Sequence, residues 1–562
     1  MKTLSHDVGR TDTALIEEPI GHYFQAMVAR FGQREALVSR HQGQRYTYQA
    51  LDRASAQLAS ALLRAGVAKG DRVGIWAHNC AEWLQMQLAT AKVGIVLVNI
   101  NPAYRVTELE YALNKVGCCM LVTMTSYKTS DYLGIVRELV PELATCAAGA
   151  LQAARAPQLR SVVHLGTQQE PGMGRFADLL ASGDPDDPAL GRVAASLSAT
   201  DPINIQFTSG TTGFPKGATL THRNILNNGF FIGEAMKLTE HDRLCVPVPL
   251  YHCFGMVLGN LACLTHGAAI IYPNDGFDPL TVLETVQAER CTGLHGVPTM
   301  FIAELAHPRF AEFDLSSLRT GIMAGSPCPI EVMKKVVSDM HMAEVTIAYG
   351  MTETSPVSCQ STTETPLETR VSTVGLVQPH LQIKVIDAES GATVPTGSTG
   401  EFCTKGYSVM HGYWGDAQKT HEAIDADGWM HTGDLATMDA QGYVNIVGRI
   451  KDMVIRGGEN VYPREIEEFL YRHPAVSDVQ VIGVPDAKYG EELCAWIILK
   501  AGQSVTAEAI RAFCVGQIAH YKVPRYVRFV DAFPMTITGK IQKFVMRDTM
   551  KKELGVADAN TA

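Results

Sequence analysis

The residues of this chain best suited to chemistry stand in the segment Thr208-Ser-Gly-Thr-Thr-Gly-Phe-Pro-Lys216-Gly217. The apolar run Ile203–Phe207 before it predicts a buried strand, and Thr221–Asn224 after it is expected to open a helix. Glycines let backbone N–H groups approach an anion, hydroxyl groups donate hydrogen bonds, and a lysine adds positive charge. The segment is not the common P-loop, because Pro215 precedes the lysine and a glycine follows it. We therefore expect a turn that wraps a polyphosphate, with a flexible surface loop as the alternative.

A second cluster, Tyr349-Gly-Met-Thr-Glu353, directly follows the apolar run Val345–Ala348. In open α/β sheets, ligands collect outside the carboxyl ends of the strands. Tyr349 is expected to cover the face of a purine, and Glu353 to hold Mg²⁺, which prefers carboxylate and phosphate oxygens. The alternative for Glu353 is a solvated carboxylate in a turn.

Three further segments carry charged or flexible residues at the ends of expected strands. Asp434 suits the two hydroxyl groups of a ribose, and Arg449 adds a fork of donors beside it. Gly457 and Gly458 permit close backbone approach to a ligand, and Lys540 follows a turn glycine near the chain end. Taken singly, each charged residue is equally compatible with a place on the solvated surface.

The order of elements predicts an α/β protein. Between residues 45 and 450, short Val- and Ile-rich runs alternate with helical patterns, which favours parallel-rich sheets covered by helices. The Ala-rich stretch Leu143–Pro157 is predicted to be helical. The pattern changes near residue 450, so we expect a large N-terminal domain over 1–450 and a small α/β C-terminal domain over 451–562, with a hinge at Lys451. One continuous domain is the alternative.

Composition narrows the class of protein. The 562 residues include 46% hydrophobic and 19% charged residues, as in soluble globular proteins. The net charge of -10 argues against a nucleic-acid partner. No apolar run approaches the roughly 20 residues of an integral membrane span, and the start lacks a secretory signal. Thirteen scattered cysteines without a C-x-x-C pair favour reduced thiols, so a cytoplasmic location is expected.

The chain resembles the adenylate-forming (AMP-binding) superfamily of acyl-CoA synthetases, luciferases and peptide-synthetase adenylation domains. The resemblance rests on five segments in the same order: TSGTTGFPKG, YGMTE, HTGD, GRIKDMVIRGGENVYP and PMTITGKIQK. The resemblance runs from about Tyr46 to Met546. VPVPLYHCFGM and MAGSP look most like the medium-chain fatty acyl-CoA synthetases. The resemblance implies the adenylate-forming enzyme fold with a mobile small domain. It also implies an ATP-dependent acid–CoA ligase that forms an acyl-adenylate with release of pyrophosphate and then a thioester with release of AMP.

The resemblance also implies roles for individual residues. The residues that would bind ATP or AMP are Thr208, Ser209, Gly210, Thr211, Thr212, Gly213, Lys216, Gly325, Ser326, Pro327, Ala348, Tyr349, Gly350, Met351, Thr352, Asp434, Arg449 and Lys540. Catalysis would rest on Lys540, Glu353 and Thr352, and Mg²⁺ would lie at Glu353 and Thr208. The loop that would bind CoA is Arg456, Gly457, Gly458 and Glu459, which would replace Lys540 when the small domain swings about Lys451. The acyl pocket would be formed by His252, Val297, Met323 and Val374.

The substrate is less defined than the reaction. Leu250–Met256 has no acidic residue, whereas the peptide-synthetase domains carry an aspartate there, so a buried α-ammonium group would lack a partner. A medium-chain fatty acid is expected, while aryl, branched and short-chain acids remain open. An acyl-AMP ligase that loads a carrier protein, a luciferase-like oxygenase and a nucleotide-binding scaffold without catalysis also remain open, as does a homodimer.

Overall fold

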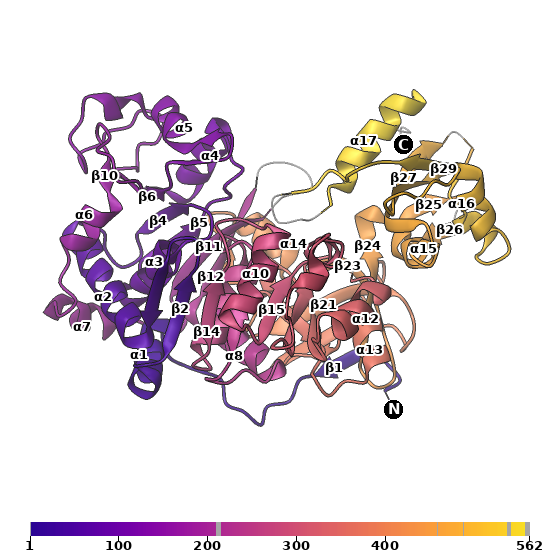
Figure 1. The fold of residues 1–562 in the computed structure, drawn as a ribbon, viewed down its shortest axis with the longest axis horizontal. Coiled ribbons are helices and arrows are strands. Elements are labelled where there is room, and N and C mark those ends of the chain that lie inside the picture. Colours follow the sequence, from indigo (N-terminus) through magenta and orange to yellow (C-terminus); the bar gives the residue numbers. More distant parts are fainter. Residues whose placement is uncertain are drawn as a thin grey trace.

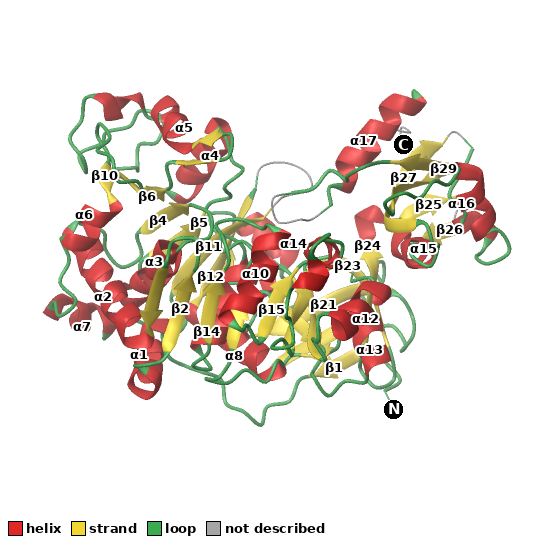
Figure 2. Cartoon of the chain, in the orientation of Figure 1, coloured by secondary structure: helices red, strands yellow, loops and turns green. Residues whose placement is uncertain are grey.

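The computed structural model describes residues 2–208, 215–326, 328–457, 459–486, 488–536 and 541–556. This part of the chain forms a large lobe and a small C-terminal lobe beside it, which is coloured orange to yellow in Figure 1. Figure 2 shows that helices and strands are mixed in both lobes. Of the residues described, no helix is long and apolar enough to cross a membrane.

The first sheet of the large lobe is mostly parallel. From β10 to β11 its neighbouring strands run parallel, and β12 and β22 are added antiparallel. In spatial order its strands are β10 (Gly174–Arg175), β9 (Ser161–His164), β6 (Cys118–Thr123), β4 (Arg72–Trp76), β5 (Val96–Asn99), β11 (Pro202–Thr208), β12 (Lys216–Thr221) and β22 (Gly412–Tyr413). A short hairpin of β7 (Ser126–Tyr127) and β8 (Ser130–Asp131) lies outside it.

The second sheet has a parallel centre with antiparallel edges. Its strands are, in spatial order, β19 (Leu376–Val377), β18 (Val357–Gln360), β17 (Glu344–Gly350), β16 (Thr320–Ala324), β15 (Gly293–Gly296), β13 (Arg243–Cys245), β14 (Ala269–Tyr272), β2 (Glu35–Ser39) and β3 (Gln44–Thr47). These two sheets confirm the predicted parallel-rich architecture.

The third sheet is antiparallel throughout its described strands, a feature that the sequence patterns did not predict. Its order is β1 (His6–Val8), β20 (Leu381–Ile386), β21 (Gly400–Gly406), β23 (Met430–Met438) and β24 (Val444–Arg449). The N-terminal strand β1 therefore pairs with a strand from the distal part of the large lobe, and Figure 1 shows this end of the chain beneath the third sheet. Local periodicity carries no information on such a distant pairing.

Helices of the large lobe fill the space around these sheets. They are α1 (Ile20–Phe31), α2 (Tyr48–Arg64), α3 (Ala81–Val93), α4 (Val106–Val116), α5 (Tyr132–Leu139), α6 (Phe176–Ala181), α7 (Pro188–Ala194), α8 (His222–Ala235), α9 (Ala262–Leu264), α10 (Pro279–Glu289), α11 (Pro298–Leu305), α12 (Ile330–Asp339), α13 (Leu367–Ser372) and α14 (Ala417–Ala423). Shorter helical turns are η1 (Pro141–Ala144), η3 (Phe310–Glu312), η4 (Thr352–Thr354) and η5 (Ile450–Asp452), and η2 (Phe254–Leu261) is π-helical.

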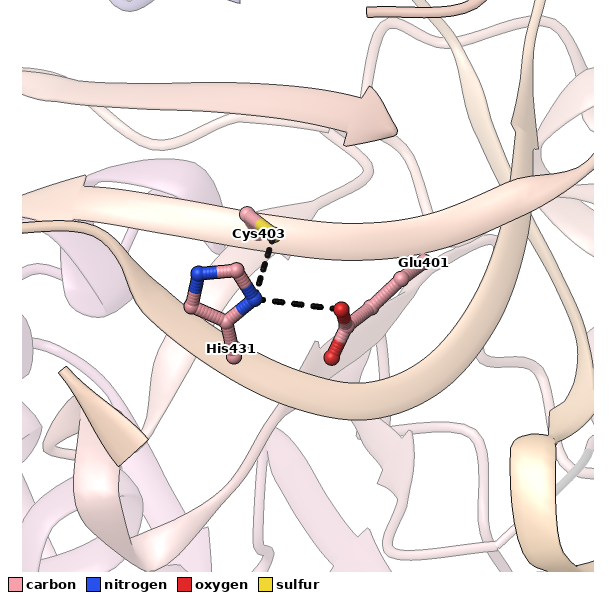
Figure 3. A group of neighbouring side chains, drawn as sticks. All are labelled: Glu401, Cys403 and His431. Atoms are coloured by element: carbon pink, nitrogen blue, oxygen red, sulfur yellow. Dashed lines mark hydrogen bonds and ion pairs between the residues drawn. The ribbon is translucent and has the colours of Figure 1, made fainter. Parts of the chain in front are cut away.

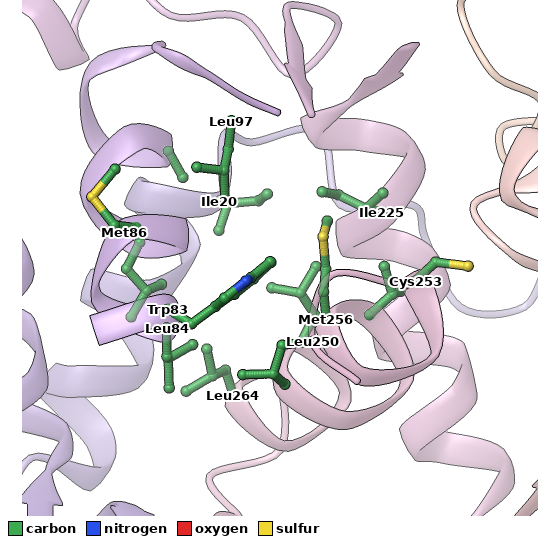
Figure 4. Close-up of a cluster of buried hydrophobic side chains, with 14 of the residues drawn as sticks. Ile20, Trp83, Leu84, Met86, Leu97, Ile225, Leu250, Cys253, Met256 and Leu264 are labelled. Carbon is green, nitrogen blue, oxygen red and sulfur yellow. The ribbon is translucent and has the colours of Figure 1, made fainter. Parts of the chain in front are cut away.

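Helix α3 lies in the centre of the largest apolar core. Almost every residue of this helix is buried, as expected for a helix covered on all sides rather than on one face. Figure 4 shows the Trp83 ring of α3 pointing toward Met256 of η2, with Ile225 of α8 and other side chains of the same core around it. This core joins residues of the first and second sheets, so the two sheets that frame the candidate site are held together by it.

The prediction of a helix over Leu143–Pro157 was wrong. Only η1 reaches into this segment, and the chain then continues as turns and extended backbone. The Leu151 N–H donates to the Arg160 carbonyl, and Gly149 has a φ of 81°, which a helix cannot include. Its buried residues, among them Ala153 and Ala156, pack individually into the core beneath α4 and α5. Tertiary burial thus overrides the helix propensity of alanine.

The small lobe has its own sheet and apolar cores. The sheet runs β26 (Glu459–Val461), β25 (Val454–Arg456), β28 (Gly490–Leu499), β27 (Val476–Asp486), with β29 (Tyr526–Phe529) paired to β28. Its helices are α15 (Pro463–Leu470), α16 (Ala507–Cys514), η6 (His520–Lys522) and α17 (Lys543–Leu554). The core clusters of this lobe contain residues from Val454 onward only, among the residues described. Lys451, the predicted hinge, lies in η5, the single helical turn between β24 and β25.

Candidate active site

The carboxyl ends of two parallel strands bring two predicted loops together. β16 and β17 are neighbours, with Ala324 opposite Ala348. Gly325 and Ser326 therefore follow one strand at the place where Met351 and Thr352 follow the other. This is the edge of a parallel sheet at which ligands bind in open α/β folds. The predicted wall of the nucleotide site is thus contiguous.

Gly325 needs its lack of a side chain. Its φ is 93°, and a Cβ atom here would lie 3.1 Å from Cγ1 of Val297. Any other residue at this position would therefore have a strained backbone, and its side chain would press against Val297, which directly follows β15. The glycine allows the backbone after β16 to turn close to Val297.

A chain of polar groups links Lys216 to Glu353. The Lys216 ammonium group donates to the Tyr413 hydroxyl over 2.9 Å, and that hydroxyl donates to Oε1 of Glu353 over 2.9 Å. The Lys216 Nζ atom also lies 4.2 Å from the centre of the Tyr413 ring. Burial, together with the charge of Glu353, raises the pKa of Tyr413, which therefore stays a neutral donor.

The partners in this chain come from separate elements. Lys216 begins β12, Tyr413 ends β22, and Glu353 lies in η4 after β17. The pairing of β12 with β22 places Tyr413 opposite Ala218, next to the lysine. Thr208, at the end of β11, is opposite Lys216 across the β11–β12 pair, so the two ends of the predicted phosphate loop lie side by side.

The predicted ribose anchors meet each other and Tyr349. Asp434 on β23 is opposite Arg449 on β24, and Nε of Arg449 lies 3.0 Å from Oδ1 of Asp434. The Tyr349 hydroxyl donates to Oδ2 of Asp434 over 2.7 Å, and burial with the Asp434 charge raises the pKa of Tyr349. Burial alone would lower the pKa of Arg449, but the charges of Asp434 and Asp452 raise it overall. Asp434 is thus buried between an aromatic ring and a guanidinium group.

Several predicted residues lie outside the described part of the chain. They are Ser209, Gly210, Thr211, Thr212, Gly213, Pro327, Gly458 and Lys540. Their roles in binding phosphate, nucleotide and CoA, and the catalytic role of Lys540, stay predictions.

The residues predicted to bind CoA are arranged within the small lobe. Arg456 makes two contacts of 2.8 Å with the carboxylate of Glu492, which is 1% exposed. Its guanidinium also lies 4.6 Å from the Tyr489 ring centre. Gly457 has a φ of 61° beside the same ring, and Glu459 is exposed at the start of β26. The loop is therefore anchored at Arg456 and open to solvent at Glu459.

The residues predicted for the acyl pocket do not gather in one place. Val297 belongs to the large core around α3, whereas Met323 and Val374 belong to a second core beside α12. Along β16 the side chains alternate, so Ile322 and Ala324 face the Val297 side and Met323 faces the other. His252 precedes the π-helical η2, and its Nδ1 accepts the Phe254 N–H over 3.2 Å.

Tyr413 is the functional candidate that sequence reasoning missed. The available signal was its place in Gly412-Tyr-Trp414, but such a short segment does not reveal a partner. Only strand pairing places its hydroxyl between Lys216 and Glu353.

Comparison with known proteins identifies the family of the chain. The profile of the AMP-binding enzyme family matches residues 24–414, and that of the AMP-binding enzyme C-terminal domain matches residues 465–540. The acyl-CoA synthetase YngI of Bacillus subtilis (strain 168) is 51% identical over 536 residues, covering 95% of this chain and 97% of that protein. The mitochondrial medium-chain acyl-CoA ligase ACSF2 of Danio rerio is 46% identical over 557 residues, covering 99% of this chain and 92% of that protein.

Solved structures share the fold. The ATP-bound crystal structure of MatB from Rhodopseudomonas palustris superposes with a TM-score of 0.81 at 30% identity, covering 95% of this chain and 99% of that one. The two lobes and their sheets therefore define an adenylate-forming enzyme fold. The chain belongs to the AMP-binding enzyme family.

Proposed function

We propose that this acyl-CoA ligase activates a medium-chain fatty acid by adenylation and then transfers the acyl group to CoA. The observation that carries the proposal is that hydrogen bonds join the three sheets in pairs. Lys216 of the first sheet reaches Glu353, which follows β17 of the second sheet, through Tyr413. Tyr349 of β17 donates to Asp434 of the third sheet. Full-length similarity to a medium-chain acyl-CoA ligase supports the substrate class.

In the first half-reaction, a substrate carboxylate oxygen attacks the α-phosphorus of ATP. The new O–P bond forms as the bond to pyrophosphate breaks, and negative charge increases on the α-phosphate. Such a reaction depends mainly on positioning and on fixed positive charge. Lys216 at the phosphate loop and Lys540 at the α-phosphate supply that charge in the proposal, while Asp434 accepts the ribose hydroxyl groups.

In the second half-reaction, the CoA sulfur attacks the acyl carbonyl carbon, and AMP leaves with the bonding electrons of the anhydride oxygen. The thiol proton is released. The Arg456–Glu459 loop lines the approach of the thiol in this proposal. Its anchorage at Glu492 supports this role, because a positioned loop loses less entropy on binding than a free one.

Glu353 fits a role in holding Mg²⁺. The residue is 5% exposed, and Oε1 accepts the Tyr413 hydroxyl, which holds the carboxylate in place. A fixed, buried carboxylate suits a hard cation. Thr208, whose Oγ1 lies 3.4 Å from the Lys216 carbonyl, would lie on the other side of the bound phosphates. Bound Mg²⁺ would neutralise phosphate charge.

We assign Tyr413 a positioning role. Its hydroxyl fixes Glu353 on one side and takes a hydrogen bond from Lys216 on the other. The neutral phenol separates a cation from an anion without neutralising either one. Lys216 therefore remains available to phosphate, and Glu353 remains available to a cation.

The proposal is tested by pyrophosphate release from ATP and Mg²⁺ across straight-chain, branched and aromatic acids, with and without CoA. We expect the highest kcat/KM for medium straight chains, with acyl-CoA and AMP formed in equal amounts when CoA is present. A maximum for benzoates would favour an aryl-CoA ligase. Formation of acyl-adenylate without thioester would favour an acyl-AMP ligase that loads a carrier protein. If no pyrophosphate is released with any acid, the protein would be a nucleotide-binding scaffold without catalysis.

Asp434→Asn provides a matched control for the substrate profile. It removes the carboxylate charge that holds the proposed ribose and keeps the shape of the side chain. We expect kcat/KM to fall by the same factor for every acid, because the change lies in the nucleotide half. A changed order of preference among the acids would contradict the proposed division of the site.

A further inference from the structure

Three side chains of different chemistry converge on the third sheet, outside the catalytic groups described above. Glu401 and Cys403 lie on β21 and His431 lies on β23, where Cys403 and His431 are directly paired residues. Nδ1 of His431 is 3.1 Å from Oε2 of Glu401 and 3.7 Å from Sγ of Cys403. Figure 3 shows the carboxylate and the thiol approaching the same ring nitrogen.

We propose that Glu401, Cys403 and His431 form a binding site for a borderline transition-metal ion such as Zn²⁺. This is the one group of three potential metal ligands within the described residues, and its ligand atoms all lie within 4.8 Å of one another. Nitrogen, sulfur and oxygen ligands in one set suit Zn²⁺ rather than Mg²⁺.

The distances agree with tetrahedral coordination. Zinc lies about 2.3 Å from sulfur and about 2.0–2.1 Å from histidine nitrogen, so tetrahedral angles place those two ligands roughly 3.5 Å apart. The observed separation of Sγ and Nδ1 is 3.7 Å. By the same geometry, nitrogen and carboxylate oxygen stand about 3.3 Å apart, against the observed 3.1 Å. An ion could be bound with small side-chain shifts and no change in strand pairing.

A carboxylate behind the histidine is a second, independent feature. Oδ2 of Asp425 lies 3.5 Å from Nε2 of His431, on the opposite side of the ring from the ligand group. Oδ1 of Asp425 accepts the backbone N–H groups of Asp427 and Trp429, which fixes the carboxylate. Metal-binding histidines commonly donate their second nitrogen to such a carboxylate, which orients the ring and selects the tautomer.

Access is also compatible with an exchangeable ion. The Cys403 residue is buried, whereas the His431 side chain is 31% exposed, so an ion can enter from the histidine side.

The proposed metal site is connected to the proposed nucleotide site by one hydrogen bond to the backbone of Gly433. Oε1 of Glu401 accepts the Gly433 N–H over 3.1 Å, and Gly433 precedes Asp434. Oε2 is the oxygen that faces the histidine, so metal binding can leave the Gly433 contact intact. An ion in this position would hold β21 and β23 together next to the proposed ribose anchor and raise the thermal stability of the large lobe.

Cobalt titration of chelator-treated, full-length protein tests the site, because a thiolate bound to Co²⁺ gives a charge-transfer absorption band. We expect one equivalent to produce the band, Zn²⁺ to abolish it and excess Mg²⁺ to leave it unchanged. Cys403→Ser should remove the band, and Asp425→Asn should weaken binding about 10–100-fold. Cys514→Ser, which replaces a buried cysteine in α16, is the matched control and should keep the band.

Circular dichroism and the melting temperature of each variant identify any variant that fails to fold. Asp425→Asn is a second test of the site because it leaves all three proposed ligands in place. Zn²⁺ should raise the melting temperature of the wild type and of Cys514→Ser, and should raise that of Cys403→Ser less. No thiolate band in the wild type, or an equal band in folded Cys403→Ser, would overturn the proposal. The cluster would then be a hydrogen-bonded network only.

Discussion

The nucleotide half and the acyl half of the candidate site differ in what holds their residues. Asp434 contacts Tyr349 and Arg449, and Glu353 contacts Tyr413, so polar groups in the nucleotide half meet partners from another strand or sheet. The residues expected around the acyl chain are instead divided between two apolar cores. Hydrogen bonds define direction and pairing, whereas apolar contacts constrain mainly volume. The arrangement of the nucleotide half therefore depends on the chemical type of its residues, and that of the acyl half depends on the shape of the space they leave.

The largest effect should come from the nucleotide half. Lys540→Ala is expected to lower the rate of acyl-adenylate formation by roughly 10²–10³, about 3–4 kcal/mol, as for the loss of one preorganised donor. The thioester step should be spared when acyl-adenylate is supplied. Single-turnover measurements of the two half-reactions check this. Equal losses in both would contradict the assignment of Lys540 to adenylation alone.

In the acyl half, Met323→Ala and Val297→Ala should separate folding from specificity. Met323 is fully buried beside α12, so its truncation should lower the free energy of unfolding by about 2–5 kcal/mol and leave the order of acid preference unchanged. Val297 borders Gly325 at the site, so its truncation should move the preferred acid toward longer or bulkier chains. Denaturant unfolding and the acid screen, run on both variants, provide the comparison. A changed preference in Met323→Ala alone would reverse the two assignments.

Tyr413→Phe tests the polar chain of the nucleotide half. The substitution keeps the ring beside Lys216 and removes the hydroxyl that joins it to Glu353. We expect kcat/KM for Mg²⁺–ATP to fall about tenfold, or ~1.4 kcal/mol, close to the lower limit for hydrogen bonds to charged groups. The main change should be a rise in the Mg²⁺ concentration that gives half-maximal activity.

Tyr443→Phe, outside the site, is the matched control for the loss of a hydroxyl. A merely structural role for Tyr413 would lower the melting temperature without altering the Mg²⁺ dependence. That pattern would refute the positioning role.

The smallest effect concerns a buried carboxyl group that, unlike Glu353 and Asp434, has no hydrogen-bond partner among the described residues. Glu304 of α11 is 1% exposed, and neither carboxyl oxygen has a hydrogen-bond partner among the residues described. Burial raises the pKa of Glu304 well above its usual value. The folded protein keeps this proton while the unfolded chain loses it above about pH 4.3. The free energy of unfolding should therefore fall as pH rises through this window, up to the folded-state pKa.

Glu304→Gln removes that titration and keeps the side-chain shape. Its melting temperature relative to wild type should rise between pH 5 and about pH 8, with the larger advantage at the higher pH. Glu138→Gln, at an exposed position, should show no such trend. A constant difference at every pH would mean that Glu304 is ionised in the folded protein or finds a partner there.

The sequence and the resemblance named the segments of the nucleotide half before their arrangement was known, because these segments follow strand ends. Ala324 and Ala348 are neighbours in a parallel sheet, so the segments that follow them lie side by side. Tyr413 could not be found in this way, since its role depends on the pairing of β12 with β22. The resemblance implied that Met323 and Val297 both line the acyl pocket, but alternation along β16 places them in different apolar cores.

By itself, the sequence determined the alternation of strands and helices, the family motifs and the residue types available for phosphate, ribose and metal. These depend on local periodicity and on short segments whose backbone needs are visible in glycine and proline. The tertiary structure alone decided the antiparallel third sheet, the extended course of Leu143–Pro157 and the convergence of Glu401, Cys403 and His431. These features arise from contacts between distant segments, and their free energy depends on packing and pairing that no single stretch of chain contains.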